Sequence, residues 1–113
     1  DADVAVRLTD VGPDGCHLLI TDGIARLSMP PPYTARTLPV PGIPAALTVD
    51  LTNHAAWTLP AGHRLGLIVS GSNYARFDAN PHDGGIFFTG TGRTASITLH
   101  LDAAARLVVT ATF

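Results

Sequence analysis

Apolar and polar residues alternate along several short stretches of this chain, and a period of two is typical of β-strands with one buried face. In the range 4–9, valine or leucine alternates with alanine, arginine or threonine. Comparable stretches follow at 16–27, 47–51, 63–70, 97–101 and 107–113, with a short apolar piece at 56–59. This spacing predicts an all-β domain of about seven short antiparallel strands, arranged as a sandwich or jelly roll.

Glycine and proline mark the turns between these stretches. Residues 12–15 read Gly-Pro-Asp-Gly, a strong turn signal that predicts a hairpin between the first two strands. Asp22 and Gly23 interrupt the second strand and predict a bulge or bend there. Six of the nine prolines lie within 29–44, which predicts an extended crossing on the surface because proline cannot donate to a β-ladder.

Length and charge narrow the class of protein. A chain of 113 residues with 46% apolar content is long enough for one domain. The net charge is −2 and the seven arginines are scattered, so neither nucleic acid nor a membrane surface is an expected partner. The single cysteine, Cys16, cannot form an internal disulfide, and no signal-peptide pattern is visible at the N-terminus. We therefore expect a cytoplasmic location.

The residues do not combine into a catalytic or metal-binding motif. None of the four serines stands in the Gly-x-Ser-x-Gly frame of a nucleophile elbow. No two histidines have zinc-ligand spacing, and His82 beside Asp83 is the nearest candidate. Cys16 is expected to be a small buried side chain rather than a nucleophile. We expect no catalytic residue, no metal and no cofactor in this chain.

A long polar segment at 71–92, rich in glycine and asparagine, is the candidate site, because loops of this length are often functional or packed on themselves. Arg76 offers five donors in a planar fork that suits carbonyls or a carboxylate, and Phe77 supplies an apolar anchor. Two interpretations stay open, namely bracing of the loop itself and docking on a ligand or a neighbouring domain. The predicted contact residues are Asn73, Tyr74, Arg76, Phe77, Asp78 and Asn80.

The polar and aromatic residues of this region allow further interpretations. Asp78, Asn80 and Asp83 offer oxygen ligands for calcium, but nearby Arg76 favours turn capping instead. The aromatic residues could form a sugar-binding platform, or they could close the open end of a sandwich or pack against another domain. The aromatic set comprises Trp57, Tyr74, Phe77, Phe87 and Phe88.

Several blocks of the chain together resemble a known family. They read Arg-Leu-Thr-Asp-Val at 7–11, Pro-Asp-Gly at 13–15, Leu-Ile-Thr-Asp-Gly-Ile-Ala-Arg at 19–26, Pro-Ala-Gly-His-Arg-Leu at 60–65 and Ser-Asn-Tyr-Ala-Arg-Phe-Asp-Ala-Asn-Pro at 72–81. In this order they resemble the C-terminal domain of the X-Pro dipeptidyl-peptidase and cocaine esterase family of acyl hydrolases. The resemblance implies a jelly-roll β-sandwich, similar to galactose-binding-like modules, which follows an α/β-hydrolase domain. The catalytic residues of the family lie in that hydrolase domain, so none transfers to this chain, and the sandwich is expected to support the hydrolase and help wall its active site.

The chain departs from the family pattern at its start and in residues 84–90. Family members carry another strand or two upstream, so we expect residues 1–113 to be a single sandwich domain that lacks them. The missing strands would leave an unpaired sheet edge and an exposed apolar face, which a companion chain or a second copy could cover. The expected partner is an α/β-hydrolase domain in the same or a companion chain. The alternatives are a stand-alone module for carbohydrate or another small ligand, and a homodimeric interaction domain.

Overall fold

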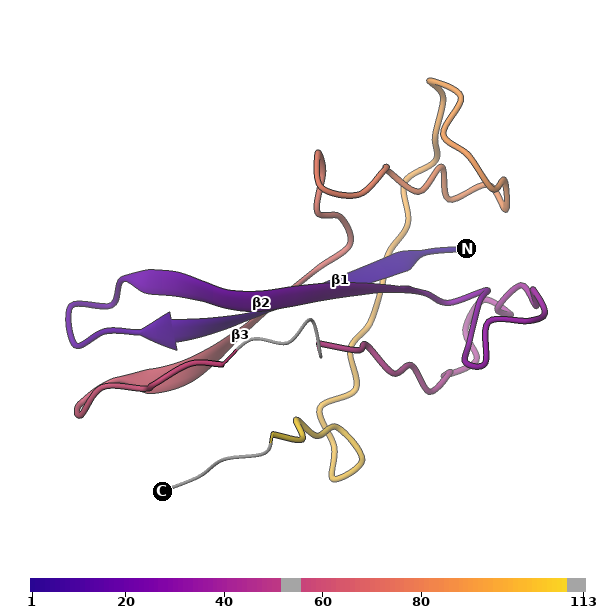
Figure 1. The fold of residues 1–113 in the computed structure, drawn as a ribbon. Helices are drawn as coiled ribbons and strands as arrows, with labels where there is room; N and C mark the ends of the chain where they lie inside the picture. Colours follow the sequence, from indigo (N-terminus) through magenta and orange to yellow (C-terminus); the bar gives the residue numbers. More distant parts are fainter. Residues whose placement is uncertain (52–55, 110–113) are drawn as a thin grey trace.

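A computed structural model describes residues 1–51 and 56–109 of the chain, and in this part it is all-β, without helices. The strands are β1 (Asp3–Val11), β2 (His17–Arg26) and β3 (Arg64–Ser70). They form one antiparallel sheet in the order β2-β1-β3, with long irregular segments around it (Figure 1). The described residues include no helix that is long and apolar enough to cross a membrane.

The hairpin of β1 and β2 forms where the sequence predicts it. Its turn is closed by hydrogen bonds of 2.9 Å from the Gly15 amide to the Gly12 carbonyl and from the Gly12 amide to the Cys16 carbonyl. Gly15 has a φ of 82°, a conformation that glycine adopts without the steric cost of a Cβ atom. The turn chemistry therefore sets the register in which Val11 pairs with His17.

The predicted irregularity of β2 is real but its position was wrong. The register shifts between Leu8 and Thr9, which pair with Thr21 and Leu19, so that Ile20 is the extra residue. Asp22 and Gly23 pair regularly with Arg7 and Val6. Glycine is needed at position 23 for another reason, because the carbonyl oxygen of Asp50 occupies the place that a Cβ atom would take.

The two faces of the sheet differ in chemistry, since paired residues of neighbouring strands lie on the same face. One face, here called the apolar face, carries the pairs Val6–Val69 and Leu8–Leu67. The other, here called the polar face, carries the pairs Asp3–Arg26 and Arg7–Asp22. The alternation that predicts the strands therefore also separates apolar residues from charged ones.

Two extended segments cross the apolar face. The Thr21 hydroxyl donates a hydrogen bond of 3.2 Å to the Leu51 carbonyl, which holds one segment against β2. The second segment brings Ile97 and Leu99 to Val4 and Val69, with which they line a hollow of about 160 Å³. The β3 side of this face, with Leu65, Leu67 and Val69, is still exposed.

Four predicted strands are absent from the described residues. The segments 47–51, 56–59, 97–101 and 107–109 are not strands there, and positions 110–113 of the last prediction lie outside the described residues. Alternation of apolar residues specifies a face, but a strand also needs a neighbour for its backbone hydrogen bonds. β1 supplies such a neighbour to both β2 and β3. The all-β prediction is confirmed, whereas the second sheet of a sandwich is not formed among the described residues.

Candidate functional site

The loop 71–92 leaves the end of β3 and rises from the polar face of the sheet, close to the N-terminus (Figure 1). It has no regular secondary structure. Its backbone turns early, where the amides of Arg76 and Phe77 both donate to the Asn73 carbonyl at 3.0 Å. Farther along, the Arg93 amide donates to the Pro81 carbonyl at 2.8 Å and closes its second half. These backbone hydrogen bonds hold the shape of a loop that takes part in no β-ladder.

Buried Asn73 fastens the first half of the loop to the sheet. Its Oδ1 accepts a hydrogen bond of 2.6 Å from Nη2 of Arg7, and its Nδ2 donates one of 3.0 Å to Oδ2 of Asp22. The same Asp22 oxygen pairs with Nε of Arg76 at 2.8 Å. One carboxamide thus joins β1, β2 and the loop, and hydrogen bonds to charged groups are the stronger kind.

Buried Asn80 fastens the second half in the same way. Its Nδ2 donates to Oδ1 of Asp3 at 2.8 Å, and its Oδ1 accepts from the His82 amide at 2.9 Å. The Asp3 carboxylate also binds Arg26 through two hydrogen bonds, from Nε at 2.8 Å and from Nη2 at 3.1 Å. The hydrogen bond to Asp3 raises the pKa of Arg26, partly against its burial, so this arginine stays charged.

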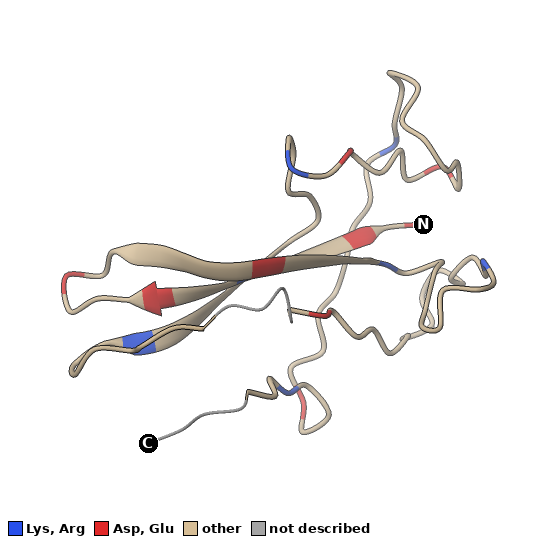
Figure 2. Ribbon diagram, in the orientation of Figure 1, with Lys and Arg blue, Asp and Glu red and all other residues tan. Residues whose placement is uncertain are grey.

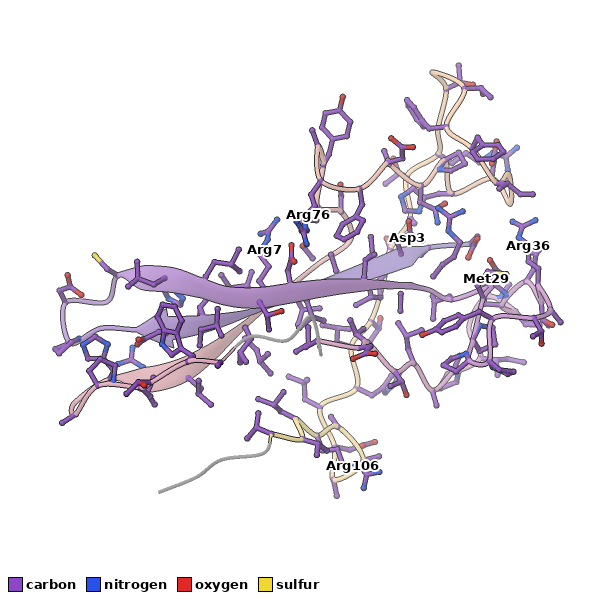
Figure 3. The ribbon with its side chains drawn as sticks, in the orientation of Figure 1. Asp3, Arg7, Met29, Arg36, Arg76 and Arg106 are labelled. Carbon is purple, nitrogen blue, oxygen red and sulfur yellow. The ribbon has the colours of Figure 1, made fainter. Side chains whose placement is uncertain are left out.

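The arginines also hold the outer part of the loop. Nη1 of Arg26 donates to the Ile86 carbonyl at 3.0 Å, and Arg36 donates to the carbonyls of Gly84 and Gly85. Arg36 also pairs with the buried carboxylate of Asp1 at 3.6 Å. In Figure 3, Asp3 and Arg36 both lie below the raised loop. The loop is therefore braced at both halves by charged side chains of the sheet and the chain start.

What the braced loop presents outward is apolar. Tyr74 is 76% exposed, Ile86 58% and Phe87 77%, and we call these three residues the tip. Phe77 is half-buried, with its ring centroid 5.5 Å from the Arg76 guanidinium carbon. Asp78 is exposed. Of the six predicted contact residues, Asn73, Arg76 and Asn80 brace the loop, while Tyr74 faces outward.

The partners of the loop could not be predicted from the sequence. Asp3, Arg7, Asp22 and Arg26 all lie on the polar face of the β1–β2 hairpin, far from the loop in sequence. The one available signal was that charged residues alternate with apolar residues along the strands. This alternation indicates a charged face of the sheet, but it does not indicate which segment packs on that face.

The proposed aromatic platform does not assemble from all five of its residues. Trp57 lies at the hairpin end of the sheet, where its Nε1 donates to Oδ2 of Asp10 at 3.0 Å. Asp10 pairs with Leu65 near the start of β3, whereas Tyr74 follows the end of that strand. Four or more strand residues separate the two positions, and each adds about 3.3 Å. A single sugar-binding surface cannot include both aromatic rings.

Asp10 joins the hairpin end to the segment that precedes β3. It is only 1% exposed, and its Oδ1 lies 2.7 Å from Nδ1 of His63. Burial, the largest influence, raises the pKa of Asp10, but the hydrogen bonds from Trp57 and His63 and the charge of His63 together lower it below its usual value. Asp10 therefore acts as an ionised fastening between segments.

Cys16 was expected to be buried and is exposed instead, because it follows the hairpin turn. A hydrogen bond to Asp14, together with desolvation, raises the pKa of its thiol. A shallow hollow of about 420 Å³ lies beside it. A raised pKa leaves less of the thiol as thiolate at neutral pH, which does not favour a nucleophilic role for Cys16. No group of three His, Cys, Asp or Glu side chains within residues 1–51 and 56–109 is arranged to hold a metal ion.

Comparison with known proteins identifies the family of this chain. The family described as the X-Pro dipeptidyl-peptidase C-terminal non-catalytic domain matches residues 1–110. The chain belongs to this family. It is also 34% identical over 86 residues to the cocaine esterase of Rhodococcus sp. (strain MB1 Bresler). The match covers 76% of this chain but only 15% of that esterase. No solved structure matches the chain significantly.

Membership of the X-Pro dipeptidyl-peptidase C-terminal domain family confirms the resemblance seen in the sequence blocks. The family description assigns the domain no catalysis of its own. The polar network on the sheet therefore has a structural role. That role does not explain why the tip of the loop is exposed.

Proposed function

We propose that this chain is the supporting domain of an acyl hydrolase, and that it docks on an α/β-hydrolase domain of the same protein. The relative that covers most of the chain is named an esterase, and the chain spans about 15% of its length. The supporting role then consists of stabilising the catalytic domain and shaping the wall of its active site. Substrate binding and catalysis belong to the companion domain.

The tip of the loop carries this proposal. Tyr74 and the adjacent pair Ile86 and Phe87 expose apolar surface on the outside of the loop, and exposed apolar surface is a feature of interaction sites. The charged contacts at Asn73 and Asn80 fix the base of the loop before any partner arrives. A rigid loop loses little conformational entropy on binding, which favours affinity. A loop that served only to brace itself would have no reason to place these side chains outward.

The finer architecture is also part of the proposal. We expect the domain to be a jelly-roll sandwich of the galactose-binding-like type, with the segments at 47–51 and 97–101 in its second layer. Both segments already lie over the apolar face and carry alternating apolar residues. The first strand or two of this sandwich would come from residues outside 1–113. Slow amide exchange at 97–101 in the intact protein would support this arrangement.

Alanine substitutions at the tip, made in the intact protein, test the docking role. Burial of a large aromatic or aliphatic side chain contributes about 1.5–3 kcal/mol, so Tyr74→Ala and Phe87→Ala should each lower the stability of the inter-domain contact by about that amount. We expect a lower melting temperature and lower hydrolase activity. Leu18→Ala, at the exposed hairpin end of the sheet, is the matched control and should change neither.

Phe77→Ala tests docking and internal bracing together. The Phe77 ring is half-buried beneath Arg76, so its loss should loosen the loop as well as weaken inter-domain packing. Melting and activity equal to those of the unmodified protein for all three aromatic variants would contradict the proposal.

The companion domain and the location have separate tests. The intact mass of the native protein, detected in cells with an antibody against this chain, should be several times the 11.8 kDa of the chain itself. The single cysteine supports a cytoplasmic location, which cell fractionation would check.

A further inference from the structure

Two arginines on the polar face are connected through Asn73 and Asp22. Arg7 and Arg76 lie side by side above the sheet (Figure 3). Arg7 donates from Nη2 to Asn73, and Arg76 pairs through Nε with Asp22. Asn73 in turn donates to the same Asp22 oxygen, so the two guanidinium groups flank a single connected network. The network holds two positive charges and one negative charge.

Within residues 1–51 and 56–109, most of the donors of this arginine pair have no acceptor. Each guanidinium has five N–H donors in a planar fork. Among the described residues, the side chain of Arg7 makes one hydrogen bond, from Nη2, and that of Arg76 makes its one polar contact through Nε. The side chain of Arg76 is also 56% exposed. An incoming group can therefore reach both forks without breaking the bracing contacts.

The surplus charge is unusual for this chain, which has nine acidic and seven basic residues. The loop that rises above the sheet carries acidic as well as basic residues (Figure 2), and Asp78 follows Arg76 by two positions. Within the bonded network itself, two guanidinium groups face the single carboxylate of Asp22, and such an excess of positive charge attracts an anion. The aromatic ring of Phe77 lies against the Arg76 guanidinium, so the anion would sit next to an apolar contact.

We propose that Arg7 and Arg76 form a carboxylate-binding site, and that an aspartate or glutamate side chain of the companion domain occupies it in the intact protein. A planar carboxylate matches the spacing of guanidinium donors and accepts two hydrogen bonds at once. This inference rests on the proposed function, and it adds the chemistry of the partner surface, namely an acidic side chain within an apolar patch that covers the tip.

Site-resolved NMR of arginine side chains tests the site with acetate as the probe. Acetate is titrated into the 113-residue chain against sodium chloride at constant ionic strength, because salt alone screens charges. The Nε–H signals of Arg7 and Arg76 should shift and saturate, with an apparent affinity at least tenfold above that at Arg106, a control outside the loop (Figure 3). Arg7→Gln and Arg76→Gln should each weaken acetate binding about tenfold, and backbone spectra show whether each variant is folded.

Repeating the titration in the intact protein identifies the native occupant. Acetate should no longer bind at Arg7 and Arg76 there, because the companion domain already fills the site. Saturation in both the chain and the intact protein would overturn the side-chain occupant. Shifts in the chain that never saturate, or that equal those at Arg106, would overturn the site itself while leaving the docking role to the tests at the tip.

Discussion

Replacing Asn73 by alanine removes the side chain that joins both strands of the hairpin to the loop. Two hydrogen bonds to charged groups are lost, to Arg7 at 2.6 Å and to Asp22 at 3.0 Å. Each such bond contributes about 1.5–3 kcal/mol, which gives about 3–6 kcal/mol for the pair. Asp22 keeps its contact with Arg76, so the expected loss lies near the lower end, about 3 kcal/mol.

Asn73→Asp is the companion variant, because it keeps an acceptor for Arg7 and loses the donor to Asp22. At an effective dielectric constant of about 20, two carboxylate oxygens 3.0 Å apart repel by about 5.5 kcal/mol, while Arg7 at 2.6 Å attracts by about 6.4 kcal/mol. These terms nearly cancel, so the loss should be that of one hydrogen bond, about 1.5–3 kcal/mol.

Urea unfolding monitored by circular dichroism measures all of these variants. The expected order of stability is the unmodified protein, then Asn73→Asp, then Asn73→Ala. Thr89→Ala, an exposed change in the same loop, is the control and should alter the unfolding free energy by less than about 0.5 kcal/mol. An Asn73→Ala variant as stable as the Thr89→Ala control would refute the bracing role of this residue.

Three further predictions concern the hairpin and its surroundings. Gly23→Ala should destabilise the domain by about 1–3 kcal/mol in urea unfolding, because the Asp50 carbonyl leaves no space for a Cβ atom. Asp10 has a lowered pKa, so its stabilising effect is complete above its usual pKa of 3.8 and is lost as the pH falls through the lower value of the folded state. The stability difference between the unmodified protein and Asp10→Asn should therefore shrink below pH 3.8 in unfolding experiments. Asp14→Ala should speed the reaction of Cys16 with a disulfide reagent at pH 8, because the hydrogen bond to Asp14 raises the pKa of the thiol.

Each of these predictions has its own control. Gly71→Ala, whose Cβ would meet nothing closer than Ile97 at 3.9 Å, should be far milder than the substitution at Gly23. An Asp10→Asn difference that stays constant between pH 7 and pH 2 would show that the ionised carboxylate contributes nothing. Equal thiol reactivity with and without Asp14 would show that its hydrogen bond does not restrain Cys16.

Local signals in the sequence were enough for the hairpin. The Gly-Pro-Asp-Gly turn and the alternation on either side of it place β1 and β2, and the same alternation places β3. The bulge was harder to place. Glycine at position 23 suggested a break in the strand, but it serves a close approach by Asp50, and the register shifts at Ile20 instead. A glycine in a strand can therefore indicate a close approach by another segment as well as a β-bulge.

Long-range pairing could not be predicted in this way. The segments at 47–51 and 97–101 have the alternation of strands, yet a strand forms only where a neighbour takes its backbone hydrogen bonds. The loop shows the same limit. Its own residues were recognisable from composition, but Asp3 and Asp22 became its partners only through the fold, across more than 50 residues of chain.

Hydroxyl-radical footprinting of the tip tests the central claim most directly. Tyr74 and Phe87 are oxidised in the isolated 113-residue chain and in the intact protein, and the rates are compared by mass spectrometry with that of Trp57 at the opposite end of the sheet. Docking of the tip on a catalytic domain predicts that both residues become strongly protected in the intact protein, while Trp57 keeps its rate. Equal oxidation of Tyr74 and Phe87 in the two forms would contradict the proposal that this domain supports a hydrolase through its loop.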